Sequence, residues 1–248
     1  MRIAALYDIH ANLPAIEAVL DEIEKHGVDQ IVVGGDVVPG PMPRETIDRL
    51  LGLKVPVQFI SGNGDRDVLT TMRGMEPVRV PEQFRDVIRW NAQQLRPEHE
   101  KLLADWPETI CLEAAGIGKV LFCHATPRSD TEVLTRLTPE DRVLSFIEGV
   151  DAELIVCGHT HMQFDRQIGR WRLINAGSVG MPFGDPGAYW LLLAESVELR
   201  HTRYDLTAAA ERVRATGYPQ AKEFATSNIL QPPSAQRMLE LLTAPRVG

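Results

Sequence analysis

The chain has 248 residues, of which 44% are hydrophobic and 24% charged, and its formal net charge is −8 at pH 7. This balance is that of a folded globular protein, which excludes a disordered or fibrous chain, and the negative charge disfavours an extended nucleic-acid-binding surface. No apolar run approaches the roughly 20 residues that cross a bilayer, and the N-terminus lacks the apolar stretch of a secretory signal. We therefore expect a cytoplasmic protein that contacts no membrane.

The first quarter of the chain alternates short apolar runs with helical patterns. The predicted strands cover 2–8, 30–33 and 57–60. The predicted helices between them cover 13–23, after a capping Asn12 and before a terminating Gly27, and 44–51. Strand and helix in alternation are typical of a parallel sheet covered by helices.

Residues 66–118 break this alternation, because they are polar and carry helical spacing between Pro97, Pro107 and the preceding strand. We expect a helical insertion there. Further strands are predicted over 119–123, 153–157, 171–174 and 189–194, with the later ones as antiparallel neighbours. The tail, about 205–248, is expected to form short helices. The simplest organisation is a single α/β domain over 1–248.

Polar side chains with metal-binding chemistry follow the apolar runs directly. They are Asp8, His10, Asp36, Asn63, His124, His159 and His161. In an open α/β sheet, binding groups gather at the carboxyl ends of the strands, so these residues are expected to converge on one site. Gly35, Gly62 and Gly158 precede ligands where we expect sharp turns with unusual backbone angles.

The spacing within this set suits cations. Residues i and i+2 of an extended segment point to the same side, which lets Asp8 and His10, or His159 and His161, hold one ion together. Seven ligands are too many for one tetrahedral ion but fit two cations about 3.5–4 Å apart. Imidazole, carboxylate and amide oxygen together favour Mn²⁺, with Fe, Zn²⁺ and Ni²⁺ as alternatives. Two such ions carry more positive charge than Asp8 and Asp36 can neutralise, so the site favours an anion such as phosphate.

The ordered set D-x-H, G-D, G-N, a lone H and G-H-x-H resembles the calcineurin-like metallophosphoesterase superfamily. The segments Asp8–Leu13 and Asn175–Gly180 are most similar to the small prokaryotic phosphodiesterases, and the motifs extend from residue 8 to about 182. The resemblance implies an α-β-β-α sandwich of two mixed sheets flanked by helices.

The resemblance also implies a ligand assignment. One metal is held by Asp8, His10, Asp36 and His161, and the other by Asp36, Asn63, His124 and His159. Asp36 would bridge the two ions, and a metal-bridging hydroxide would attack phosphorus in line.

The chain departs from the family at Gly64, where many members have a histidine that protonates the leaving group. Such help is worth about 10²- to 10⁴-fold in rate. Without it, we expect substrates whose leaving groups need no proton. Asp65 or a metal-bound water is a possible substitute, so Asp36, Asn63 and Asp65 are the predicted catalytic residues.

The predicted substrate-binding residues are Asn12, Arg128, Gly177 and Ser178. Each has a competing structural explanation: Asn12 as a helix cap, Arg128 as an exposed loop residue, and the Gly177–Gly180 loop as a tight turn between strands.

These residues together predict a dinuclear metal-dependent phosphodiesterase acting on a small phosphate ester or nucleotide. A phosphatase, including one for phosphoproteins, or a dinucleoside polyphosphate hydrolase is the alternative within enzymes. A non-catalytic scaffold of the same fold is the alternative from another class. Specificity is expected to reside in the 66–118 insertion, and the oligomeric state stays open.

Overall fold

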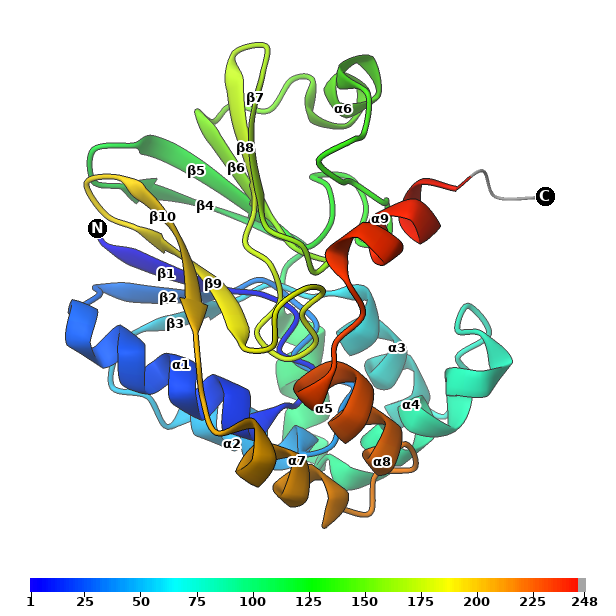
Figure 1. Cartoon of the computed structure of the whole chain (residues 1–248). Coiled ribbons are helices and arrows are strands. Elements are labelled where there is room, and N and C mark those ends of the chain that lie inside the picture. Colours follow the sequence, from blue (N-terminus) through cyan, green and yellow to red (C-terminus); the bar gives the residue numbers. More distant parts are fainter. Residues whose placement is uncertain (245–248) are drawn as a thin grey trace.

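A computed structural model, described here over residues 1–244, contains two five-stranded sheets that face each other (Figure 1). In sheet 1 the strand order is β10 (Val197–Thr202), β9 (Ala188–Leu193), β1 (Ile3–Leu6), β2 (Gln30–Val33) and β3 (Val57–Phe59). In sheet 2 it is β4 (Thr109–Ala114), β5 (Gly118–Cys123), β6 (Leu154–Cys157), β8 (Trp171–Asn175) and β7 (Phe164–Ile168). Both sheets are mixed, since parallel central pairs are flanked by antiparallel ones.

Helices cover the outer faces of both sheets (Figure 1). Those packed on or near sheet 1 are α1 (Leu13–His26), α2 (Pro43–Leu51), α3 (Asn63–Met72), α4 (Glu82–Gln94), α5 (Pro97–Asp105), α7 (Leu206–Arg214), α8 (Ala221–Phe224) and the π-helix Ala225–Leu230. Helix α6 (Glu140–Ile147) packs on sheet 2, and α9 (Ala235–Thr243) ends the described chain. No helix within residues 1–244 is both long and apolar enough to span a membrane.

The alternation of side chains along β1 builds two of the three apolar cores. Ile3 and Ala5 point into the core between the sheets, whereas Ala4 and Leu6 pack against the helices outside sheet 1. The third core lies between sheet 2 and α6, where Val143 and Ile147 are buried. Because both faces of the central strands are covered, β1, β2 and β6 are buried throughout, and the predicted α-β-β-α sandwich is confirmed.

Several predicted elements match closely. Asn12 caps α1 by accepting a hydrogen bond from the Ala15 N–H, and Gly27 ends the helix in the left-handed conformation with φ 59°. The strands over 30–33 and 119–123, and the helix over 44–51, lie where the sequence placed them, within a residue or so.

Three strands were not predicted, and all three are edge strands: β4, β7 and β10. Their exposed positions carry polar side chains, so they lack the continuous apolar run of a central strand. The helical insertion therefore ends at Asp105, and residues 109–114 form a strand of sheet 2 instead.

The prediction that the later strands are antiparallel neighbours is wrong. β8 pairs parallel with β6, and β9 belongs to the other sheet. The reason is the missed strand β7, which runs antiparallel beside β8 and reverses the chain between β6 and β8.

Candidate metal centre

All seven predicted metal ligands follow the carboxyl ends of strands. Asp8 and His10 follow β1, Asp36 follows β2, Asn63 follows β3, His124 follows β5, and His159 and His161 follow β6. The first three strands belong to sheet 1 and the other two to sheet 2. Because the two sheets face each other, residues up to about 150 positions apart lie in one buried cluster, as in the contact of His10 with His161.

The first group of ligand atoms belongs to Asp8, His10 and His161, and it lies within 4.8 Å. His10 Nε2 is 3.3 Å from His161 Nε2, and His161 Nε2 is 3.6 Å from Asp8 Oδ1. Asp36 Oδ2 lies 3.7 Å from His10 Nε2. These four side chains are the set assigned to one metal by the family resemblance.

The second group lies on the other side of Asp36. Asp36 Oδ1 is 3.6 Å from His124 Nε2, which in turn is 3.2 Å from the carboxamide oxygen of Asn63. That oxygen is 3.0 Å from His159 Nδ1. Asp36 thus directs one carboxylate oxygen to each group, which is the placement that a bridging ligand needs.

One local feature in particular fits a cation. Asp8 Oδ1 is fully buried but has no hydrogen-bond partner in the described residues. A buried acceptor without a donor costs free energy, and a cation beside it removes that cost. The Asn63 carboxamide faces the ring nitrogens of His124 and His159 and the Asp130 carbonyl, to which it can donate its N–H groups or between which its oxygen can face a cation. The donor set therefore fits divalent metal ions.

The backbone at the centre is held in sparsely populated conformations. Asp8, His10, Asp36, His159 and His161 have φ between 47° and 65°, although none is glycine. Strain of this kind persists only where the surroundings fix it, and it concentrates at functional sites. Here a ladder of main-chain hydrogen bonds fixes it, including Asp8 N–H to Gly35 O at 3.1 Å and His10 N–H to Asp36 O at 2.9 Å.

The glycines that precede ligands serve different purposes. Gly35 adopts the expected positive φ of 94°. Gly62 and Gly158 do not; they allow close approach, since a Cβ would lie 2.3 Å from Asp36 Oδ1 at Gly62 and 2.6 Å from Asp8 Oδ2 at Gly158. The expectation of unusual backbone angles is therefore right for Gly35 alone.

Electrostatics keep Asp8 charged and His159 neutral. Burial by itself raises the pKa of Asp8, but the nearby rings of His161, His124 and His10 outweigh it and lower that pKa to about 2. Burial and the neighbouring His124 lower the pKa of His159 to about 4. A neutral imidazole beside an ionised carboxylate is the state that binds a metal.

Asp65 lies behind the centre and not within it. Its carboxylate accepts hydrogen bonds from the main-chain N–H groups of Asp36 at 2.7 Å, Val38 at 3.0 Å and Gly62 at 3.0 Å. Burial and the charge of Asp36 raise the pKa of Asp65 to about 7. Both oxygens are occupied by the two loops that carry Asp36 and Asn63, so the geometry assigns Asp65 to holding these loops in place.

A side chain at position 64 would collide with the neighbouring backbone. A Cβ on Gly64 would lie 2.6 Å from the Val38 carbonyl oxygen and 2.7 Å from Pro39 Cδ. Separations under 3.0 Å require a neighbouring atom to shift. The backbone as it stands therefore has no room for the histidine that the family resemblance leads us to expect there.

Three predicted substrate-binding groups are engaged within the protein. Asn12 is fully buried, donates to Gly180 O at 2.9 Å and caps α1. The Gly177 N–H donates to Asn175 Oδ1 at 2.9 Å. Ser178 Oγ is buried, donates to Asp8 O at 2.8 Å and accepts from Met181 N–H at 2.8 Å. Their direct contact with substrate stays a prediction.

Arg128 points toward other protein groups. Its guanidinium pairs with Glu132 at 2.6 Å, donates to Ser145 O at 2.9 Å and lies over the Phe146 ring at 4.7 Å. Arg128 nevertheless lines a cavity of about 310 Å³ that also touches His124. The arginines that share this cavity, Arg66 and Arg79, were missed because neither lies in a recognisable motif.

Asn175 was not singled out as a positioning residue, although its motif was quoted. Its amide nitrogen donates to Gly158 O at 2.6 Å and Thr160 Oγ1 at 3.1 Å. It therefore anchors the segment that carries His159 and His161.

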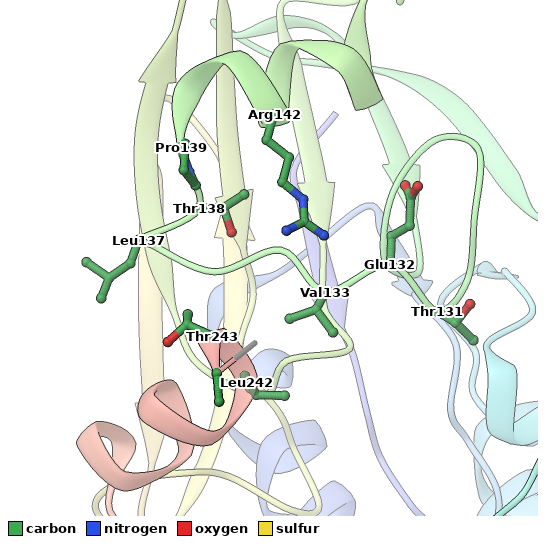
Figure 2. A pocket seen from close by; sticks show the side chains of 10 residues that line it. Thr131, Glu132, Val133, Leu137, Thr138, Pro139, Arg142, Leu242 and Thr243 are labelled. Carbon is green, nitrogen blue, oxygen red and sulfur yellow. The ribbon is translucent and has the colours of Figure 1, made fainter. Parts of the chain in front are cut away.

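A cavity of about 720 Å³ lies elsewhere (Figure 2). Figure 2 shows it between α9 and the segment 131–142, with Arg142 pointing in from α6 and Leu242 and Thr243 forming the opposite wall. It contains none of the seven predicted ligands, so its size is no indication of chemistry.

Comparisons with known proteins identify relatives. The family model for the calcineurin-like phosphoesterase superfamily domain matches residues 1–196. An uncharacterised protein of Methanocaldococcus jannaschii is 30% identical over 88% of this chain and 94% of its own length. Phosphodiesterase YfcE of Escherichia coli K12 is 26% identical over 77% of this chain and 87% of its own length.

Solved structures share the fold. A hypothetical protein of Pyrococcus horikoshii superposes with a TM-score of 0.79 at 20% identity, covering 94% of this chain and 99% of its own. A metallophosphoesterase of Sphaerobacter thermophilus superposes with a TM-score of 0.73 at 24% identity, covering 91% and 97%. At these identities the likeness establishes the architecture of the chain.

Proposed function

The chain belongs to the calcineurin-like phosphoesterase superfamily and is a metal-dependent phosphoester hydrolase, and on this basis we propose that it is a phosphodiesterase with two divalent cations. The observation that carries the proposal is the position of Asp36, whose two carboxylate oxygens lie 3.7 Å from His10 Nε2 and 3.6 Å from His124 Nε2. One acid between two ligand groups is the arrangement of a dinuclear site.

Each cation has its own set of side chains. Asp8, His10, Asp36 and His161 would hold the first, and Asp36, Asn63, His124 and His159 the second. When bound, the two ions supply an activated water at neutral pH and positive charge for the oxygens of the transition state. The mixed nitrogen and oxygen donors favour Mn²⁺, with Fe, Zn²⁺ and Ni²⁺ as alternatives.

The protein itself contributes rigidity around that chemistry. The main-chain ladder and the left-handed backbone fix the ligands before substrate binds, which avoids reorganisation during the reaction. The scaffold alternative is disfavoured because all seven ligand side chains are present and converge, whereas a protein that only binds a partner has no need of them.

The choice of a diester over a monoester rests on Gly64. The site has no histidine there and no room for one, so good leaving groups are favoured over those that need a proton. Asp65 as a substitute acid is a weaker proposal, because its three main-chain donors hold its carboxylate away from a proton-transfer role. A small phosphate ester or nucleotide, hydrolysed in the cytoplasm, is the substrate class we propose.

The proposal is tested with bis-p-nitrophenyl phosphate and p-nitrophenyl phosphate as paired substrates. Protein stripped by a chelator should hydrolyse neither, and added Mn²⁺ should restore cleavage of the diester above that of the monoester. Metal analysis should give two ions per chain. Activity confined to the monoester would replace the phosphodiesterase by a phosphatase, and one bound ion at saturation would overturn the dinuclear centre.

A further inference from the structure

The cavity of about 310 Å³ beside the metal centre has the lining of an anion site. His124, a ligand of the second cation site, forms part of its wall, so the cavity adjoins the reacting phosphoryl group. Its lining contains the arginines Arg66, Arg79 and Arg128, and the hydroxyl residues Thr126, Ser129 and Thr131. No phenylalanine, tyrosine or tryptophan of the described chain lines it, which disfavours a base or an aryl group as its occupant.

The three arginines differ in what they already bind. Arg66 is paired with Asp130, and Arg128 with Glu132. Arg79, from the segment between α3 and α4, makes no side-chain hydrogen bond or ion pair among the described residues. Its charge acts to lower the pKa of the nearby Asp67 carboxyl, but the two groups form no ion pair. The planar donors of the exposed Arg79 guanidinium are therefore available to phosphate oxygens.

Acidic groups also line the cavity and reduce its positive electrostatic potential. Asp130 is neutralised by Arg66, but Glu108 is exposed and unpaired within the described residues. Glu108 opposes an anion, so its removal and the removal of Arg79 should act in opposite directions. Opposite changes in anion affinity in the two variants would indicate a specific electrostatic effect, because damage to the fold would weaken binding in both.

On the basis of the proposed function, we infer that this cavity binds a second phosphate of the substrate, linked to the one that is hydrolysed, and that Arg79 is the residue that selects it. The substrates preferred by this chain are then those with two or more linked phosphates, and bis-p-nitrophenyl phosphate occupies the metal centre alone. The insertion would thereby determine specificity through a residue that takes no part in metal binding.

The test compares inorganic phosphate with methylene bisphosphonate, a non-hydrolysable pair of linked phosphoryl groups, as inhibitors of bis-p-nitrophenyl phosphate cleavage in excess Mn²⁺. Arg79→Gln should weaken bisphosphonate about 10-fold, the lower end for a charge-assisted hydrogen bond at an exposed site, and change phosphate less than about 2-fold. Arg79→Lys should fall between. Glu108→Gln should tighten bisphosphonate about 2-fold or more.

Arg214→Gln is the matched control, since Arg214 is an exposed arginine on α7 without a side-chain hydrogen bond in the described residues. Chelation of Mn²⁺ by bisphosphonate would affect every variant equally. Equal bisphosphonate-to-phosphate ratios in wild type, Arg79→Gln and Arg214→Gln would overturn the inference while diester cleavage still supports the proposed function. If diester cleavage fails altogether, calorimetric titration of the metal-loaded variants with bisphosphonate still decides for or against the cavity.

Discussion

The metal centre and the insertion helices are held in place by different interactions. At the centre, the ligand side chains are mostly buried, and the backbone is strained and tied together by main-chain hydrogen bonds. The insertion helices α4 and α5 instead pack on the rest of the protein through ordinary apolar side chains such as Val87, Ile88 and Leu103, and an exposed ion pair joins Arg96 to Asp48 of α2. We therefore expect changes at the centre to alter chemistry, and changes at the exposed positions of the insertion to alter selectivity.

The largest expected effect comes from the acid shared by both ligand groups. Asp36→Asn removes a charge that both proposed cations would need, so hydrolysis of bis-p-nitrophenyl phosphate should fall by more than about 100-fold, the upper range for residues that merely support a ligand. Metal analysis should show fewer bound ions. Asp105→Asn, an exposed acid at the end of α5, is the control and should retain wild-type rate.

Retained metal binding and activity in Asp36→Asn would contradict the expectation that changes at the metal centre, unlike those in the insertion, alter chemistry. The scaffold alternative instead predicts no turnover in wild type or variant, with capture of a binding partner unchanged by Asp36→Asn.

A smaller effect is expected from Ser178, which touches no predicted ligand side chain but holds two of the ligand segments. Its hydroxyl donates to Asp8 O, 170 positions away, and accepts from Met181 N–H; the Met181 carbonyl is 2.7 Å from His161 Nδ1. Ser178→Ala should lower Mn²⁺ affinity or turnover about 10- to 100-fold. Calorimetric titration of chelator-stripped protein measures the affinity.

The substrate-binding role predicted for Ser178 gives the opposite result. A raised KM with unchanged Mn²⁺ affinity would support direct contact with substrate. Ser145→Ala, an exposed serine on α6, should leave both quantities unchanged.

The third effect concerns the stability of the centre. Gly64→Ala places a Cβ 2.6 Å from the Val38 carbonyl oxygen, and such overpacking should cost about 1–3 kcal/mol in the free energy of unfolding. Urea unfolding of metal-free protein measures it. Gly217→Ala is the control, because its Cβ would make only ordinary contacts with Trp90 at 3.8 Å.

A stable Gly64→His variant with a gain in monoester hydrolysis would contradict the steric argument. It would mean that the loop can move and that the absence of the leaving-group acid is a matter of sequence alone.

How far the sequence predicted this molecule also differs between regions. The central strands β1, β2 and β6 are apolar on both faces, so continuous runs predicted them. The edge strands β4, β7 and β10 bury only some of their side chains, and their polar positions concealed them.

The same division holds at the site. Residue type and spacing predicted which side chains would converge, because the side chains of Asp, Asn and His carry the oxygen and nitrogen atoms that bind metals. The functions of the supporting residues were not predictable, since the bond from Ser178 to Asp8 and the cavity around Arg79 depend on approaches between distant segments. No local sequence pattern indicates which distant segments lie close together in the fold.

The smallest expected effect is at Asp48, which ties the insertion to α2. Hydrogen bonds from Arg96 lower the pKa of Asp48 below its usual 3.8, with burial opposing and His99 assisting. A carboxylate with a lowered folded pKa stabilises the protein above the unfolded pKa, and this stability is lost as pH falls through the lower, folded value.

Asp48→Asn should therefore lower the free energy of unfolding at neutral pH by less than about 1 kcal/mol, since the side chain is 43% exposed and screened by solvent. The difference in unfolding free energy from wild type should shrink as pH falls below the usual carboxyl pKa of 3.8, as urea unfolding across that range would measure. Diester hydrolysis should be unchanged. A loss of activity as large as that of Ser178→Ala would mean that the insertion and the metal centre are mechanically coupled, because the ion pair itself is too weak to produce it.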